Sequence, residues 1–328
     1  MSKPVIAITM GDPAGIGPEL IVRVLSDAAV NDRCRPFIVG DLRIMRDNAA
    51  LLGSAMTFQP IDDLSQARFA PAAVEVLSPT GFELGPVPAS EVDPVLGKAA
   101  ALYLQTAFDL ALRQQVQGVV AAPMNKASFH LAGYHYFDEL EFLANLTRSK
   151  ETFILGSLGS VWAVAVTEHI AFKDIIAHIK AERIFRYIQH LHAALSKAGV
   201  AAPRIAVAAL NPHAGEGGLF GREEIDEIAP AVEQAVRAGI HAHGPVPADI
   251  VFRRALDGAF DGVVCMYHDQ MNIARKLQAR QDTATLFMGL PVIAATTAHG
   301  TAFDIAGQGI ADPGSLAAAL DYVIRLAS

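Results

Sequence analysis

The sequence predicts an α/β protein in which helices cover both faces of largely parallel sheets. Short, continuous apolar runs alternate with longer helical stretches along the chain, as expected for strands that are buried between two layers of helices. The chain has 328 residues, which favours two α/β lobes or one large α/β unit over a single typical core. Hydrophobic residues make up 52% of the chain, which is ample for burial and argues against disorder.

The order of the elements follows from where the apolar runs begin and end. Strands are expected at Val5–Met10, Pro36–Val39, Gly118–Ala122, Val161–Val166, Arg204–Leu210, Gly262–Tyr267 and Pro291–Ala295. Helices are expected at Glu19–Ser26, Leu96–Gln115, Ile184–Ala198, Glu223–Ala238 and Pro313–Ala327. The turn GDPAGIGP leads from the first strand into the first helix, and the Pro-rich stretch Gly85–Pro94 is expected to be a surface loop.

Composition excludes several classes of protein. The net charge of −8 argues against a general affinity for nucleic acid or for anionic membranes. The two cysteines, Cys34 and Cys265, do not form the framework of a secreted disulfide-rich protein. The N-terminal apolar run breaks at Gly11, so it predicts a strand and not a signal peptide, and no apolar stretch reaches the roughly 20 residues of a membrane helix. A soluble, cytoplasmic protein is expected.

Three histidines stand where buried strands should end. His169 follows VWAVAVTE, His213 follows IAVAALNP and His268 follows GVVCMY. In open α/β sheets, ligands bind at the carboxyl ends of the strands. Three imidazoles at one such edge predict a site for a divalent metal: Zn²⁺, or Co²⁺, Ni²⁺, Mg²⁺ or Mn²⁺.

Other polar residues near strand ends allow two interpretations each. The GDPAGIGPE segment, residues 11–19, is either a tight structural turn or an anion-binding loop at a helix start. Lys126 is either an exposed lysine or a group that binds a carboxylate or transfers a proton. Asp269 could orient His268, polarise bound water or cap a helix, and Asp249 could be an N-cap or a proton relay.

Six motifs together resemble the 4-hydroxythreonine-4-phosphate dehydrogenase family over nearly the whole chain. They are GDPAGIGPE, NPHAGEGG, PADIVF, YHDQ, GLP and HGTAFDIAGQGIADPGS. The last motif also resembles isopropylmalate dehydrogenases, where HG-containing residues bind the adenosine of NAD. The resemblance implies a two-lobed fold like that of isocitrate and isopropylmalate dehydrogenases. The first lobe, with the cofactor segments, would be residues 1–130 plus 290–328, and the second would be residues 131–289.

The resemblance also implies cofactors, partners and site residues. The metal ligands of the family fall on His169, His213 and His268 and come from both subunits of a homodimer. NAD or NADP would be bound by the segment that opens HGTAFDIAG. The cofactor-binding residues that the resemblance implies are His299, Gly300, Thr301, Ala302 and Asp304. Lys126, Asp249 or Asp269 would relay the proton when a small hydroxy acid is oxidised and decarboxylated.

The substrate positions of the family are where this chain departs most. The substrate lysine is kept as Lys276, but Glu139 and Leu140 stand at the His-Thr pair, Thr285 at an asparagine and Ala294 at an arginine. A carboxylate placed 4 Å from a phosphate costs about 1–4 kcal/mol. We therefore expect a non-phosphorylated substrate. The chain also resembles the cis-dihydrodiol carboxylate dehydrogenase branch of this family in LAN at Leu143–Asn145 and LFG at Leu219–Gly221, which implies an aromatic cis-dihydrodiol carboxylate as the substrate.

Two alternatives remain at this stage. The substrate could be 4-hydroxythreonine 4-phosphate or a sugar-acid phosphate, with Arg275, Arg280 or His135 replacing the missing phosphate donors. The chain could also be a non-catalytic metabolite-binding protein on a dehydrogenase fold.

Overall fold

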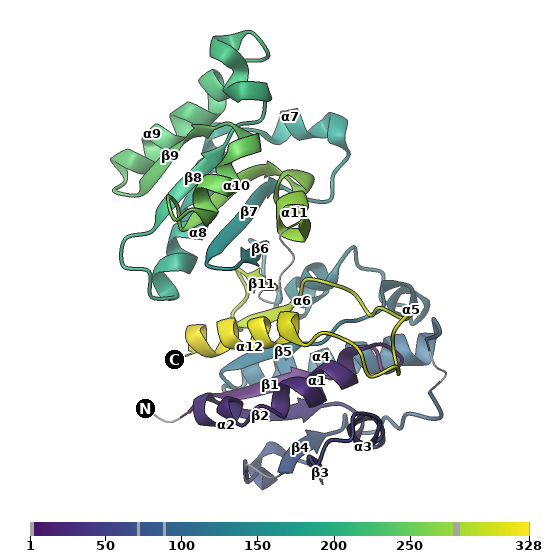
Figure 1. Cartoon of the computed structure of the whole chain (residues 1–328). Helices are drawn as coiled ribbons and strands as arrows, with labels where there is room; N and C mark the ends of the chain where they lie inside the picture. The colour runs from purple at the N-terminus through teal and green to yellow at the C-terminus, as the bar shows by residue number, and fades with distance from the viewer. Residues whose placement is uncertain (1–2, 71–72, 88–89, 278–282, 328) are drawn as a thin grey trace. The chain divides into compact units, whose positions relative to one another are not determined.

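The computed structural model describes residues 3–70, 73–87, 90–277 and 283–327. The chain forms two compact units of mixed α/β structure, Met1–Phe153 with Ala284–Ser328 (unit 1) and Ile154–Thr283 (unit 2) (Figure 1). The α/β fold class predicted from the sequence is confirmed. Residues 131–153 and 284–289, which the sequence placed in the second lobe, group with unit 1. Aromatic packing explains the first of these segments, because Phe142 lies edge-on to Phe129 with ring centroids 5.1 Å apart. Strand pairing explains the second, because β11 (Ala284–Met288) pairs with β12 (Ala294–Thr297).

Unit 1 is built on a mostly parallel set of strands. Their order is β3-β4-β2-β1-β5-β12-β11. Their bounds are β1 Val5–Thr9, β2 Arg35–Val39, β3 Thr57–Ile61, β4 Ala73–Leu77, β5 Gly118–Ala121, β11 Ala284–Met288 and β12 Ala294–Thr297. Thr9 of β1 lies opposite Val39 of β2 and Ala121 of β5. The ends of these central strands are therefore level, and the loops that follow them meet.

The strand predicted at Pro291–Ala295 is displaced to Ala294–Thr297. β12 runs antiparallel to β11, so the chain must turn between the two strands. Gly289, with φ +79°, begins this connection, and Pro291 has no backbone N–H to donate to a ladder. The apolar run therefore starts before the strand does.

Four helices of unit 1, α3 to α6, begin at a side chain that caps them. Asp41, Asp93, Asn125 and Asp138 each accept a backbone N–H at a helix start. The helices are α1 Gly17–Leu25, α2 Ala29–Arg33, α3 Leu42–Leu51, α4 Pro94–Leu112, α5 Lys126–Leu131, α6 Glu139–Thr147 and α12 Gly314–Ala327, with a 3₁₀ turn at Leu64–Gln66. Among the described residues, α4 is long and apolar enough to cross a membrane, but 56% of that window is buried inside the protein, as in a core helix.

Unit 2 has a five-strand set in the order β6-β7-β10-β8-β9. The strands are β6 Phe153–Leu158, β7 Val161–Thr167, β8 Arg204–Ala208, β9 His241–Val246 and β10 Gly262–Tyr267. All neighbours in this set are parallel except β6 and β7. Every residue of β7 is buried, which is why its sequence is apolar throughout.

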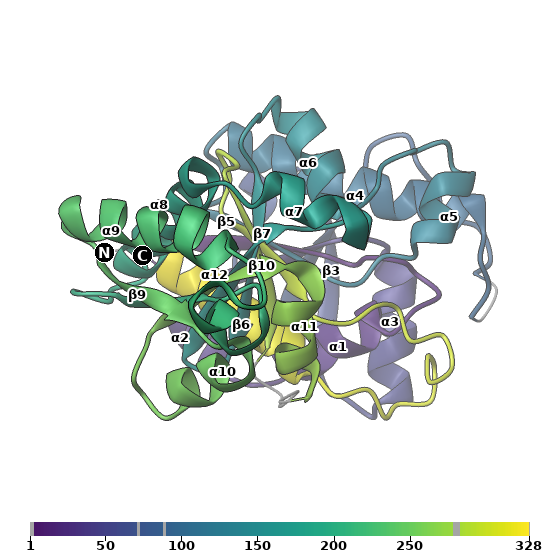
Figure 2. The ribbon, with the colours of Figure 1, turned by 90° about the horizontal axis from the view of Figure 1, so that it is seen from above.

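Helices cover both faces of this sheet (Figure 2). They are α7 Ile175–His178, α8 Ala181–Lys197, α9 Ala229–Arg237, α10 Ala248–Leu256 and α11 His268–Leu277, with 3₁₀ turns at Phe172–Asp174 and Pro212–Gly218. Val263 and Cys265 of β10 pack with Phe252 of α10, whereas Gly262 lies against Leu191 of α8. Alternate residues of β10 thus face α10 and α8.

The helix predicted over Glu223–Ala238 is divided. Glu224–Ile228 forms a π-helical turn, and α9 begins at Ala229. Pro230 cannot donate the usual backbone hydrogen bond, so the preceding turn widens.

Candidate metal and cofactor sites

The three predicted histidines lie beyond the carboxyl ends of adjacent strands of unit 2. His169 comes two residues after β7, His213 follows β8, and His268 is the first residue of α11 directly after β10. β10 is parallel to both β7 and β8, so these three strands end at one edge of the sheet. The burial of three apolar strands thus carries the histidines to the same side of the unit.

Two of these histidines form a cluster with a carboxylate. Glu168, His169 and His268 each offer one ligand atom, and the three atoms lie within 4.8 Å of one another. The rings of His169 and His268 have centroids 5.5 Å apart. Two imidazoles and one carboxylate suit a divalent metal such as zinc. The donor set therefore fits the predicted metal, although sequence reasoning did not include Glu168.

Asp269 holds the imidazole of His268. The His268 Nδ1 lies 2.7 Å from Asp269 Oδ1. With a proton on Nδ1, the ring donates to the carboxylate and turns its Nε2 lone pair outward as a metal ligand. Of the three roles open to Asp269, orienting His268 is the one that this contact supports.

His213 does not belong to the cluster of Glu168, His169 and His268 in the single chain. Its side chain is 67% exposed, and its Nδ1 lies 3.2 Å from Glu216 Oε1. The segment 213–217 has positive φ at every residue, including the non-glycine residues His213 (+50°), Ala214 (+58°) and Glu216 (+45°). This backbone is costly for residues with a Cβ, so the surrounding structure must hold it.

Glu224 supplies that support, and sequence reasoning missed it. This carboxylate is buried. Its Oε1 accepts the backbone N–H groups of Leu210 and Asn211 at 2.8 and 2.7 Å, and its Oε2 accepts from Asn211 Nδ2 at 2.9 Å. A Cβ on Gly215 would lie 2.8 Å from Glu224 Oε2. One buried carboxylate therefore fixes the start of the NPHAGEGG loop, and only the fold reveals it.

The other predicted residues of unit 2 lie on helices. Asp249 is exposed in the first turn of α10, and the N-cap position belongs to Pro247, so the N-cap interpretation of Asp249 is wrong. Lys276 is exposed near the end of α11. Arg275 is buried and donates to Ser157 O at 3.3 Å and to Asn272 Oδ1 at 3.0 Å. Arg280 lies outside the described residues.

The predicted cofactor segment of unit 1 packs against the GDPAGIGP turn. The Ile16 N–H donates to Thr301 O at 3.0 Å, and a Cβ on Gly15 would lie 2.9 Å from the Thr301 Cβ. Thr301 is buried, whereas His299, Gly300 and Asp304 are exposed and Ala302 has φ +42°. Two glycine-containing loops are thus held together, with exposed groups beside them that could contact a ligand.

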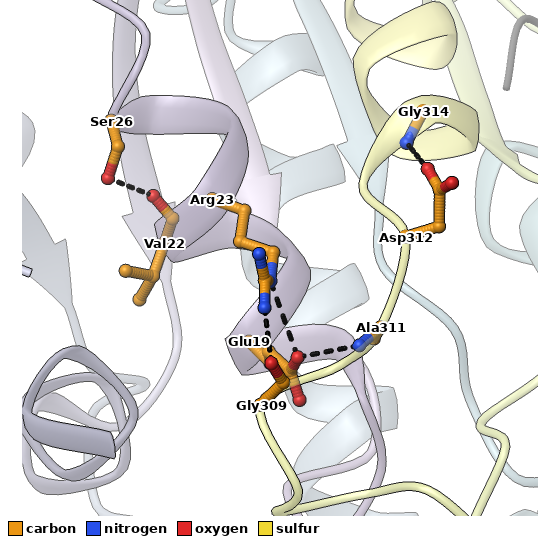
Figure 3. A network of polar contacts seen from close by, with 8 residues as sticks. All are labelled: Glu19, Val22, Arg23, Ser26, Gly309, Ala311, Asp312 and Gly314. Carbon is orange, nitrogen blue, oxygen red and sulfur yellow. Dashed lines mark hydrogen bonds and ion pairs between the residues drawn. The ribbon is translucent and has the colours of Figure 1, made fainter. Parts of the chain in front are cut away.

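A second contact, shown in Figure 3, ties the same segment to α1. The buried Glu19 accepts the Ala311 N–H at 2.8 Å and pairs with Arg23, whose Nη2 donates to Gly309 O. Beside it, the Asp312 carboxylate accepts the Gly314 N–H at the start of α12. These hydrogen bonds hold the backbone of residues 309–314 in one conformation against α1 and at the start of α12.

Asp12, in the GDPAGIGP turn, is a buried acid. Its Oδ1 accepts the Ala14 N–H at 2.9 Å, and its Oδ2 has no hydrogen-bond partner. Burial raises the pKa of this carboxyl to about 6, against the hydrogen bonds from Ala14 and Ser128 that lower it. The turn is therefore held by a group that loses its proton just below neutral pH.

Glu139 and Leu140 begin helix α6. Leu140 is buried, and the Oε1 atom of Glu139 is buried without a hydrogen-bond partner. Burial raises the pKa of Glu139 to about 8; Asp138 adds to this effect and Lys126 opposes it. Glu139 is consequently protonated at neutral pH. Lys126 itself is exposed and donates to Phe137 O at 3.4 Å.

Thr285 and Ala294 lie on the antiparallel pair β11–β12. Thr285 is opposite Thr296, and Ala294 is opposite Phe287. Ala294 is 4% exposed, so its side chain is enclosed by its neighbours. An arginine at this position would need space that the packed strands do not provide.

Comparison with known proteins places the chain in a single family. The sequence profile described as pyridoxal phosphate biosynthetic protein PdxA matches residues 32–323. The D-threonate 4-phosphate dehydrogenase of Cupriavidus necator is 40% identical over 99% of this chain and 98% of its own length. The structure of 4-hydroxythreonine-4-phosphate dehydrogenase from Klebsiella pneumoniae matches with a TM-score of 0.84 and 36% identity, covering 99% of this chain and 100% of that one.

A second solved structure is less similar. The terephthalate 1,2-cis-dihydrodiol dehydrogenase of Burkholderia xenovorans matches with a TM-score of 0.68 and 29% identity, covering 99% of this chain and 98% of that one. All three similarities extend over nearly the full length of this chain and of the protein compared.

Proposed function

The chain belongs to the PdxA family, and on this basis we propose that it is a dehydrogenase that oxidises a hydroxyl group of a phosphorylated hydroxy acid with NAD or NADP. The observation that carries the proposal is the 40% identity, over 99% of the chain, to a D-threonate 4-phosphate dehydrogenase. This replaces the non-phosphorylated substrate expected from the sequence, because the terephthalate-type enzyme is the more distant match. A purely metabolite-binding role is likewise set aside in favour of catalysis.

The protonation of Glu139 removes the main objection to a phosphorylated substrate. The Coulomb penalty expected from the sequence applies only to a carboxylate. A neutral carboxylic acid instead has an O–H that it can donate to a phosphate oxygen. With a pKa near 8, Glu139 keeps that proton at neutral pH. We propose Glu139, Leu140, Lys276, Thr285 and Ala294 as substrate-binding residues, the positions that the family resemblance implies.

We propose that His169 and His268 hold a divalent metal, with Glu168 within ligand distance. When bound, the metal would supply Lewis acidity to the substrate hydroxyl. Asp269 fixes the His268 ring for this task. Lys126, Asp249 and Asp269 remain the candidates for moving the hydroxyl proton, and Asp269 is the one in contact with a proposed metal ligand.

A second copy of the chain would supply His213. Large apolar side chains stand exposed beside both histidine segments: Ile170, Phe172 and Ile176 after His169, and Leu219 and Phe220 after His213. Exposed apolar groups in such number are typical of surfaces that bind another protein. We therefore propose a homodimer in which these segments are covered. Light scattering that shows an active monomer at assay concentration would contradict it.

The proposal is tested by following NADH absorbance with three substrates in the presence of added Zn²⁺, Co²⁺ or Mg²⁺. We expect turnover of D-threonate 4-phosphate or 4-phosphohydroxy-L-threonine, with CO₂ released, and little turnover of a terephthalate dihydrodiol. His268→Ala should abolish activity and lower bound metal. The control His178→Ala, at an exposed position on α7, should not. Efficient turnover of the dihydrodiol alone would overturn the assignment.

A further inference from the structure

A hollow of about 540 Å³ lies in unit 2 at the starts of its strands. Its walls come from the end of α9, the first half of β9, α10 and the loop before β10. Its lining residues include Val236, Ile240, His241, His243, Arg254 and Phe260. This volume is within the range of pockets that bind small organic molecules.

The hollow is separate from the proposed metal site. His241, at the start of β9, is in register with Arg204 at the start of β8, whereas His213 follows the end of β8. Five strand residues span about 16 Å. A small ligand in the hollow would therefore not reach the histidines at the opposite edge of the sheet.

The charge of the hollow favours an anion. Its lining contains no aspartate or glutamate. Arg204 is already neutralised, because its guanidinium donates to both carboxylate oxygens of Asp261 at 2.9 and 3.1 Å. Arg254 has no such partner: within the described part of the chain, no carboxylate lies within ion-pair distance of it, whereas its neighbour Arg253 pairs with Asp257. One uncompensated guanidinium matches a single negative charge.

The lining of the hollow favours a ligand with a flat apolar body. The guanidinium carbon of Arg254 lies 5.1 Å from the ring centroid of Phe260. The His243 ring stacks on the same Phe260 with centroids 5.7 Å apart and planes inclined by 23°. Val236, which is 54% exposed, adds apolar surface, and Ile240 is almost fully buried beside it. Aromatic and aliphatic groups beside one fixed cation are typical of sites for apolar acids.

We propose that this hollow binds a small organic monoanion with a flat apolar body, of the aromatic carboxylate class. The carboxylate is held by the guanidinium fork of Arg254, and the body of the ligand lies against Val236 and the small exposed parts of Phe260 and Ile240. His241 and His243 offer ring N–H groups to the same carboxylate. A phosphate dianion is a poorer match, because the second negative charge has no uncompensated partner.

The experiment is a titration of the full-length protein with benzoate, followed by NMR shifts of the histidine and phenylalanine rings. Saturable binding in the millimolar range is expected for a ligand of this size. Arg254→Ala should weaken it at least tenfold, and the matched variant Arg253→Ala less than twofold. Methyl benzoate, which lacks the charge, and inorganic phosphate, which lacks the ring, should both bind more weakly than benzoate.

Two further results would overturn the proposal. If benzoate binding is lost in His268→Ala and kept in Arg254→Ala, the ligand binds at the metal edge and not in the hollow. If shifts are linear with concentration, or equal in both arginine variants, the hollow has no site. Because this titration measures binding without turnover, its outcome is independent of the dehydrogenase assay.

Discussion

Replacing Glu139 with glutamine is expected to stabilise the protein against unfolding at neutral pH but not at acidic pH. In the folded protein, burial raises the pKa of this carboxyl from 4.5 to about 8. Between those values the folded state keeps the proton and the unfolded state has lost it. The stabilisation present below pH 4.5 is therefore lost as the pH rises towards 8. Glutamine has no proton to lose, so the variant lacks this dependence.

The size of the effect follows from the pKa difference. Within the window between 4.5 and about 8, each pH unit lowers the free energy of unfolding of the wild type by about 1.4 kcal/mol. From pH 5 to pH 7.5 this loss of unfolding free energy would be about 3 kcal/mol for a fully buried carboxyl. Glu139 is partly exposed to solvent, so we expect about 2 kcal/mol. The advantage of Glu139→Gln over the wild type should grow by this amount across the same interval.

Urea unfolding at pH 5, 6 and 7.5, followed by circular dichroism, measures this difference in unfolding free energy between Glu139→Gln and the wild type. Glu83→Gln is the control, since Glu83 is an exposed acid in a loop of the same unit. The free energy of unfolding of Glu83→Gln should differ from that of the wild type by the same amount at every pH. If the difference for Glu139→Gln is also constant, the Glu139 carboxyl is ionised in the folded protein at neutral pH, and it cannot act as the neutral donor proposed for a phosphate.

Three other substitutions test particular contacts. Gly97→Ala places a Cβ 2.0 Å from the Ser128 carbonyl oxygen, so it should lower the free energy of unfolding by about 1–3 kcal/mol or more and lower the Tm. The control Gly85→Ala has open space around its Cβ and should leave the Tm unchanged. An unchanged Tm for Gly97→Ala would refute the close packing of α4 and α5. Glu224→Ala leaves two loop N–H groups without an acceptor, so the free energy of unfolding measured in urea should fall by about 2–4 kcal/mol. We also expect protease cleavage near residue 213, and a loop that stays resistant to protease would contradict this. Asp12→Asn should gain stability over the wild type as the pH rises from 3.8 to about 6, because the folded wild type holds its proton there; a constant difference across pH 4–7 would refute the raised pKa.

Several features of this protein can be predicted from the sequence because they depend on local pattern. Continuous apolar runs such as Val161–Thr167 are strands buried on both faces, and parallel strands carry the residues after them to one edge. This is why His169 and His268, 99 positions apart in the chain, could be expected together and are found with ring centroids 5.5 Å apart. The resemblance to the PdxA family, based on short motifs around these strand ends, is confirmed by the family profile over residues 32–323 and by a relative that matches 99% of the chain.

Other features were decided only by the tertiary structure. No local pattern shows that the ligand atoms of Glu168, His169 and His268 lie within 4.8 Å of one another. Nor does one show that Glu224 holds the start of the strained loop that contains His213. The charge of Glu139 is the clearest case. From the sequence we expect an acid that would repel phosphate, and in the fold burial raises its pKa to about 8. The physical reason is common to all of these: apolar periodicity is a property of neighbouring residues, whereas desolvation and the meeting of polar groups depend on segments that only folding brings into contact.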